Sequence, residues 1–104
     1  MNWKKPENEE LVKAFLALKN ADEAQRFLRD LLTEDEIKEF AKRLQTAEML
    51  LAGASYVDIQ KKTGFSSTTV ARVSRWLNRG KNGYKTIINK LHHHSSRQGR
   101  KGLS

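Results

Sequence analysis

Residues 55–78 constrain the fold more than any other part of the chain, because they read as two short helices joined by a tight turn at Gly64. Glycine adopts the left-handed backbone conformation of such a turn at little cost. Ile59 before the turn, and Val70 and Val73 after it, have the spacing of helical side chains that pack against one another. The pattern predicts a helix-turn-helix, whose second helix stands out from the domain and can enter a groove of DNA.

The second helix of this pair starts with short hydroxyl side chains and carries arginines further along. Short hydroxyls allow close approach to base edges and phosphates, and an arginine in the major groove can bind guanine through two hydrogen bonds. The flanking lysines suit phosphate contacts, as do Lys81 and Lys85. The predicted DNA-contact residues are Ser66, Ser67, Thr68, Ala71, Arg72, Arg75, Lys61, Lys62 and Arg79.

Charge is divided unevenly along the chain. Residues 1–52 contain 9 Lys and Arg and 11 Asp and Glu, a net charge of −2, whereas residues 53–104 contain 11 Lys and Arg and one acid, Asp58, a net charge of +10. A basic half can serve solubility alone. It can also attract a polyanion, because neutralising phosphates releases their counterions. Since the positive half coincides with the predicted helix-turn-helix, we favour nucleic acid as the partner.

The whole chain favours an all-α fold, because glycine and proline are scarce before Gly53 and no segment shows the alternation of a strand. Four polar residues at helix starts are predicted to cap the helices that follow them: Asn20, Thr33, Ser55 and Ser66. The predicted helices are 7–19, a segment after Asn20, 34–52, a segment after Ser55, a segment from Ser66 to near Gly80, and 84–91.

The length of 104 residues allows one domain with short extensions. We expect a flexible N-terminus over residues 1–7, a helical domain over 8–91 and a disordered basic tail over 92–104, where Leu103 is the sole aliphatic residue. A domain this small leaves much apolar surface uncovered, so a partner chain is expected.

Several classes of protein are disfavoured. There is no cysteine, no apolar run near the ~20 residues needed to span a bilayer, and no apolar segment after the N-terminus, so we expect a cytoplasmic protein. The run His92-His93-His94 cannot direct all three rings at one ion on a helix, so no metal site is predicted. The hydroxyls of residues 66–69 have no histidine base nearby. We therefore expect no catalysis and no cofactor.

Several separated stretches, in order along the chain, resemble the Trp repressor superfamily and, within it, the YerC/YecD-type Trp-repressor-like branch. The likeness covers about residues 8–91. It rests on residues 31–36 (Leu-Leu-Thr-Glu-Asp-Glu), Arg43, 48–53 (Glu-Met-Leu-Leu-Ala-Gly) and 69–72 (Thr-Val-Ala-Arg). The likeness to the branch rests on residues 41–44, 53–56, 63–64, 72–75, 77–78 and 83–84.

This resemblance implies an all-α fold of six helices that forms an intertwined homodimer, with the fourth and fifth helices as DNA-reading heads. The partner it implies is double-stranded DNA carrying a palindromic operator. In Trp repressor, the corepressor indole lies between two arginines and beside a glycine. Arg43 and Arg72 match the arginines, and Thr33 matches a residue near the ligand. Val73 replaces the glycine and Trp76 replaces a serine contact, so the resemblance implies no tryptophan corepressor here.

The sequence thus favours a sequence-specific DNA-binding regulator of transcription, acting as a repressor. Three alternatives stay open: a nucleic-acid binder without sequence preference, architectural or RNA-directed; a regulator that senses another small ligand; and a pure interaction module. The operator, the regulated genes and the direction of regulation do not follow from the sequence.

Overall fold

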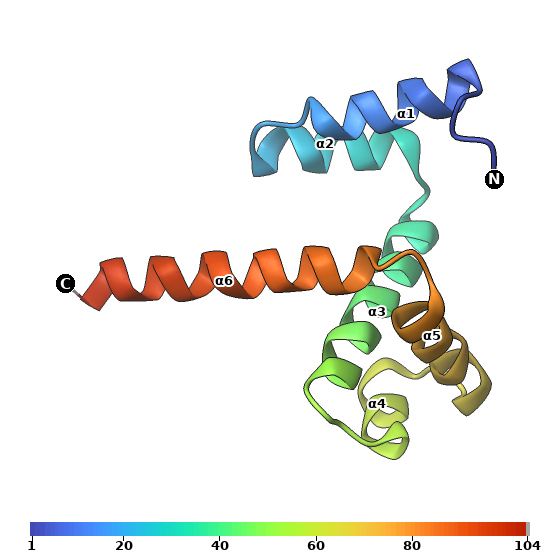
Figure 1. Ribbon diagram of the computed structural model, residues 1–104, viewed down its shortest axis with the longest axis vertical. Coiled ribbons are helices and arrows are strands. Elements are labelled where there is room, and N and C mark those ends of the chain that lie inside the picture. Colours follow the sequence, from blue (N-terminus) through green and yellow to red (C-terminus); the bar gives the residue numbers. More distant parts are fainter. Residues whose placement is uncertain (104) are drawn as a thin grey trace. The chain divides into compact units, whose positions relative to one another are not determined.

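The computed structural model describes the backbone of residues 1–103 and the side chains of residues 1–93. Over residues 1–103 all regular structure is helical, which confirms the predicted all-α class (Figure 1). The helices are α1 Pro6–Leu16, α2 Ala21–Leu31, α3 Glu34–Leu51, α4 Tyr56–Thr63, α5 Ser67–Arg79 and α6 Gly83–Leu103. The chain divides into two compact units, Met1–Lys38 and Glu39–Ser104, and each is described by itself.

The predicted capping residues are confirmed. Asn20, Thr33, Ser55 and Ser66 each accept a hydrogen bond from the backbone N–H three residues later, at 2.9, 3.1, 3.1 and 3.2 Å. These bonds satisfy amide groups that a helix leaves without partners in its first turn. The starts of four helices are therefore fixed by local chemistry rather than by packing.

The start of α3 carries a reciprocal pair of capping bonds. The Glu36 carboxylate accepts a hydrogen bond from the Thr33 backbone N–H at 2.9 Å, while the Thr33 hydroxyl accepts one from the Glu36 N–H at 3.1 Å. Hydrogen bonding of the Glu36 carboxylate, mainly to the Thr33 backbone N–H and secondly to the Thr33 side chain, holds the pKa of Glu36 below its usual value. Because a lowered carboxyl pKa favours the folded state above the unfolded pKa, this contribution is lost as the pH falls through the folded value.

Two helix ends differ from the prediction by more than one residue. The first helix was predicted to reach Lys19, but α1 ends at Leu16. The Lys19 backbone N–H instead donates to the Glu23 carboxylate at 3.2 Å, so Lys19 belongs to the N-terminal cap of α2 and cannot continue α1. The last helix was predicted to end at Leu91, but α6 continues to Leu103. The side chains of residues 94–104 lie outside the described residues, and disorder of the 92–104 tail stays a prediction.

The unit Met1–Lys38 has no interior of its own. Neither α1 nor α2 contains a buried residue. The two helices meet through an edge-to-face contact between Phe15 and Phe27, whose ring centroids are 5.7 Å apart. The large apolar residues of the predicted stripes stay between 41% and 79% exposed: Leu11, Val12, Phe15, Leu16 and Leu31. This unit therefore carries a broad apolar surface that its own side chains do not cover.

The unit Glu39–Ser104 contains the core. Ala47 of α3, Val73 and Leu77 of α5 and Ile88 of α6 form one buried cluster. The predicted contact between α4 and α5 is confirmed, because Ile59 and Val70 are both fully buried and these two helices are in contact. Fully burying a valine or isoleucine contributes about 1.5–3 kcal/mol. α5 is therefore packed against the unit through one side, which carries Val70, Val73 and Leu77.

One buried polar atom on α3 has no partner. The side chain of Thr46 is fully buried, and its hydroxyl oxygen makes no hydrogen bond within the described part of the chain. A buried hydroxyl without a partner costs about 1–3 kcal/mol relative to a satisfied one. Valine has the same branching at Cβ, without the hydroxyl.

We therefore expect Thr46→Val to leave the free energy of unfolding unchanged or to raise it by about 1 kcal/mol. Urea denaturation followed by circular dichroism measures the difference, and Thr46→Ala is the control, because it leaves a cavity and should be less stable than Thr46→Val. A loss of more than about 1 kcal/mol in Thr46→Val would show that the hydroxyl is satisfied in solution.

Candidate nucleic-acid interface

The turn between α4 and α5 has the geometry that the sequence predicts. Gly64 lies in the left-handed region, with φ 77° and ψ 3°, and its N–H donates to the Gln60 carbonyl at 2.8 Å. The hydroxyl of the buried Thr63 donates to the Ile59 carbonyl at 2.7 Å and accepts from the Phe65 N–H at 3.1 Å. The polar side chain of Thr63 can be buried at this turn because its hydroxyl both donates and accepts a hydrogen bond.

The exposed and buried sides of α5 are clearly separated. Val70, Val73 and Leu77 are buried against the unit, at 0–4% exposure. Every residue predicted to contact DNA is exposed: Ser66, Ser67, Thr68, Ala71, Arg72, Arg75, Lys61, Lys62 and Arg79. The periodicity of 3.6 residues per turn places the small and basic side chains of α5 opposite its apolar ones. α5 thus presents a continuous polar face outside the core.

The hydroxyl groups at the start of α5 have different roles. The Ser66 oxygen accepts from the Thr69 N–H at 3.2 Å and lies 3.1 Å from the Thr69 hydroxyl, so it serves the helix cap. Ser67 and Thr68 make no side-chain hydrogen bond to any other described residue. Their hydroxyls are therefore the ones available to an external ligand, whereas a DNA contact by Ser66 stays a prediction.

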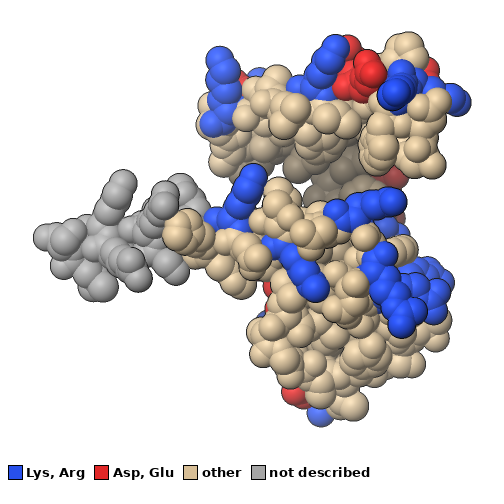
Figure 2. Space-filling view, in the orientation of Figure 1, with Lys and Arg blue, Asp and Glu red and all other residues tan. Residues whose placement is uncertain are grey.

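Positive charge gathers on the same unit, and the cations of α4 and α5 have no acidic partner among the described side chains. Figure 2 shows Lys and Arg side chains grouped over α5 and along the start of α6, with few acidic groups on this face. The ion pairs within residues 1–93 use Arg26, Arg29, Arg43 and His92, and none uses a cation of α4 or α5. Uncompensated cations on an exposed helix favour binding of a polyanion.

The C-terminal half of α5 has a shallow polar concavity lined by Ala71, Ser74, Arg75, Asn78 and Arg79. The Asn78 amide N–H donates to the Ser74 carbonyl at 2.9 Å, which fixes the orientation of the amide. The two arginines beside it are exposed. Guanidinium groups on such a surface suit phosphate oxygens or a guanine edge. Ser74 and Asn78 were not among the predicted contacts, although their helical spacing from Ala71 and Arg75 could have indicated them.

Arg43 of α3 is engaged by side chains of its own unit. Its guanidinium lies over the Phe40 ring and over the Trp76 ring, with the carbon 5.4 Å from each centroid, and its Nε is 3.5 Å from the Glu39 carboxylate. Cation–π contacts of this kind contribute about 0.5–2 kcal/mol each, depending on desolvation. Arg43 is thus held by two aromatic rings and one acid, and Trp76 is its partner across the helices.

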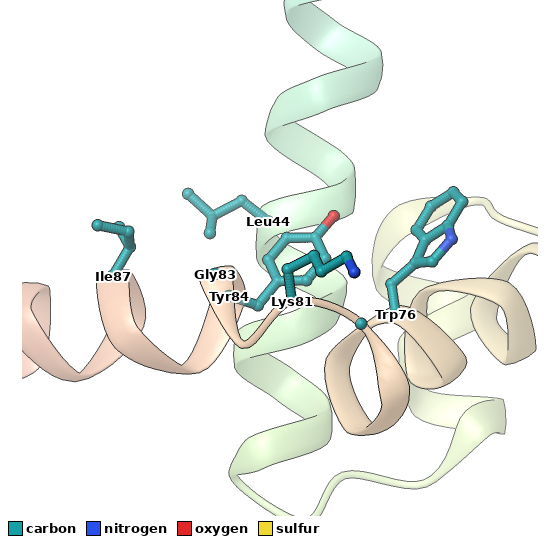
Figure 3. Close-up of a pocket in the computed structure, with 7 residues that line it drawn as sticks. Leu44, Trp76, Lys81, Gly83, Tyr84 and Ile87 are labelled. Atoms are coloured by element: carbon teal, nitrogen blue, oxygen red, sulfur yellow. The ribbon is translucent and has the colours of Figure 1, made fainter. Parts of the chain in front are cut away.

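An open, largely apolar groove of about 530 Å³ lies beside Trp76, where α5 leads into α6. Its wall comes from Leu44 of α3, Trp76 of α5, and Tyr84 and Ile87 of α6, with Lys81 at the edge (Figure 3). Burial raises the pKa of the Tyr84 phenol, and the Arg43 charge partly offsets the increase. Ile87 is 50% exposed, so the groove is open to a partner.

Other chemistry finds little support among the described residues. No group of three or more His, Cys, Asp or Glu side chains within them could hold a metal ion. His92 instead lies 3.4 Å from the Glu48 carboxylate. None of the described helices is both long and apolar enough to cross a membrane.

The comparisons with known proteins agree with one another. Residues 7–92 match the family model described as Trp repressor protein. The chain is 39% identical over 85 residues to the YerC protein of Bacillus subtilis (strain 168), itself described as uncharacterized, covering 82% of each chain. The crystal structure of a TrpR-like protein from Eubacterium eligens ATCC 27750 is 40% identical with a TM-score of 0.83, over 86% of this chain and 93% of that one.

A second solved structure has a similar TM-score. It is a protein from Staphylococcus aureus described as a candidate Trp repressor, 34% identical with a TM-score of 0.82, over 88% of this chain and 95% of that one. The likeness thus extends over 82% of the YerC protein and over more than 90% of each solved chain.

The turn gives a direct test of the α4–α5 geometry. A Cβ at residue 64 would have no atom within 4 Å, so Gly64→Ala introduces no clash and costs only the left-handed backbone conformation. We expect a loss of about 1–2 kcal/mol in the free energy of unfolding, measured by thermal denaturation. Gly83→Ala is the matched control: a Cβ there is equally unhindered and the φ is not positive, so stability should stay level or rise. Equal effects at both positions would contradict the assigned turn.

Proposed function

Because the chain belongs to the Trp repressor protein family, we propose that it is a sequence-specific DNA-binding regulator of transcription that acts as a repressor in the cytoplasm. The proposed reading head is a helix-turn-helix formed by α4 and α5. One observation carries the proposal: the polar face of α5 is exposed and its cations have no acidic partner among the described side chains. Such a surface meets the two requirements of groove binding, access and positive charge.

The contacts divide by position on the helix. Ser67, Thr68, Ala71 and Arg72 lie in the first two turns of α5, where a recognition helix approaches base edges. Arg75 and Arg79 lie further along, and Lys61 and Lys62 lie in the last turn of α4. These outer cations suit phosphates, which position the protein without specifying sequence. We assign base reading to the first group and phosphate binding to the second.

We propose further that the protein works as a homodimer. The support is the apolar surface of α1 and α2, which contain no buried residue, together with half-exposed apolar side chains on α3 and α6, namely Phe40, Leu51, Ile87 and Leu91. A single soluble chain rarely leaves so many large apolar groups uncovered. Two-fold symmetry would place two reading heads about 34 Å apart, one turn of the double helix, on a palindromic operator.

The decisive experiment is binding of a duplex selected from a random-sequence pool, measured in competition with random duplex. A specific regulator should prefer the selected duplex by about 10³-fold or more. Arg72→Ala should weaken binding to the selected duplex by about 1–3 kcal/mol. It should also reduce the preference of the protein for the selected duplex over random duplex. If the variant kept the wild-type preference for the selected duplex, Arg72 would not contact bases. Equal binding of all duplexes by the wild-type protein would favour an architectural role instead.

We propose that tryptophan is not the corepressor. In the family, the two arginines matched by Arg43 and Arg72 enclose the indole of the ligand. Here the Arg43 guanidinium already lies over the ring of Trp76, and Val73, which stands at the position of the family's glycine, is fully buried. Adding a ligand to a space already filled by side chains requires displacement, and overpacking costs about 1–3 kcal/mol.

We therefore expect L-tryptophan to leave the melting temperature unchanged and to produce no saturable heat in calorimetry. A ligand that binds only the folded state raises stability by RT ln(1 + [L]/Kd), about 2.7 kcal/mol at a hundredfold excess over Kd. Saturable stabilisation by L-tryptophan, absent with D-tryptophan, would overturn the expectation and restore a corepressor role.

A further inference from the structure

Lys42 brings a positive charge from α3 to the beginning of α5. Its ammonium nitrogen lies 6.0 Å from the centroid of the Phe65 ring. Phe65 directly precedes Ser66, the residue that caps α5. The Lys42 side chain is exposed, so the charge is accessible from outside. A residue of the long helix α3 therefore lies beside the turn from which the proposed recognition helix starts.

The charge of Lys42 has no partner among the described side chains. The carboxylate one turn earlier on the same helix, Glu39, is 3.5 Å from Arg43 Nε, and no acid lies within 4.0 Å of Lys42. The Phe65 ring does not neutralise the ammonium, because an aromatic ring carries no net charge. The position therefore retains a full positive charge that an external anion can use.

We propose that Lys42 binds a backbone phosphate of the DNA duplex, so that the docking surface comprises α3, α4 and α5. This inference rests on the proposed function. The major groove is about 12 Å wide and is bordered by phosphates of both strands, so a helix start inside it has phosphates nearby on either side. Lys61 and Lys62 lie in the last turn of α4, and the Lys42 ammonium from α3 lies beside Phe65, directly before α5. A lysine serves here as a flexible point charge.

The competing source of the anion is a carboxylate of a second copy of the chain. The acidic start of α3, with Glu34, Asp35 and Glu36, could supply one. The two sources of the anion predict different effects of removing the Lys42 charge. A phosphate contact changes the number of counterions released on DNA binding, whereas a carboxylate contact changes the self-association of the protein.

The test measures affinity of the full chain for a random-sequence duplex by fluorescence anisotropy, between about 50 and 200 mM salt. The variants are Lys42→Gln, Lys42→Arg and, as a matched control, Lys19→Gln, which removes an exposed lysine between α1 and α2. We expect Lys42→Gln to reduce the slope of log affinity against log salt by about 1 and to weaken binding roughly fivefold to tenfold. Lys42→Arg and Lys19→Gln should keep the wild-type slope.

Other outcomes would contradict the proposed function or the proposed Lys42 contact. A wild-type protein that shows no salt-dependent binding to any duplex would refute the proposed function itself. Normal wild-type binding with an unchanged slope in Lys42→Gln would refute the Lys42 contact alone, and so would an equal loss in Lys19→Gln. Weakened self-association of Lys42→Gln in sedimentation, with an unchanged slope, would assign its anion to the second copy. Thermal denaturation of each variant checks that the loss of the Phe65 contact has not unfolded the unit.

Discussion

The account depends on the packing of one side of α5. Val70, Val73 and Leu77 are buried together with Ile59, Ala47 and Ile88, and this contact turns the opposite side of the helix to solvent. The hydroxyls and guanidinium groups of α5 are exposed for this reason and not through any interaction of their own. A helix held along one apolar stripe, with a glycine turn before it, is a rigid support for a polar face. Loss of this packing would remove the candidate interface as a whole.

Sequence reasoning predicted the local features of this arrangement well, because they depend on neighbours in the chain. The caps at Asn20, Thr33, Ser55 and Ser66, the left-handed Gly64 and the buried stripe of α5 all follow from spacing and residue type. The contacts of Lys42 with Phe65 and of Arg43 with Trp76 join residues more than twenty positions apart. No periodic pattern encodes such pairs, so only the fold shows them. The end of α6 was also missed, because polarity of residues 92–104 was read as absence of helix.

The Arg43–Trp76 contact bears on the proposal that tryptophan is not the corepressor. An aromatic side chain that stacks on Arg43 from within the same unit needs no ligand to be present. Under the proposed function, regulation then acts through the amount of protein or through a ligand other than tryptophan. The open groove beside Trp76 and Tyr84 is a place where such a ligand, or the apolar surface of a second copy, could lie.

The central claim is that the exposed face of α5 is the surface that contacts DNA. Its most direct test is a nuclear magnetic resonance titration of the isotopically labelled protein with a selected duplex, following each backbone amide. The account predicts the largest chemical-shift changes over residues 66–79 and at Lys61 and Lys62, reduced when the salt concentration is raised. Changes confined to α1 and α2 or to the groove beside Trp76, with α5 unaffected, would contradict it.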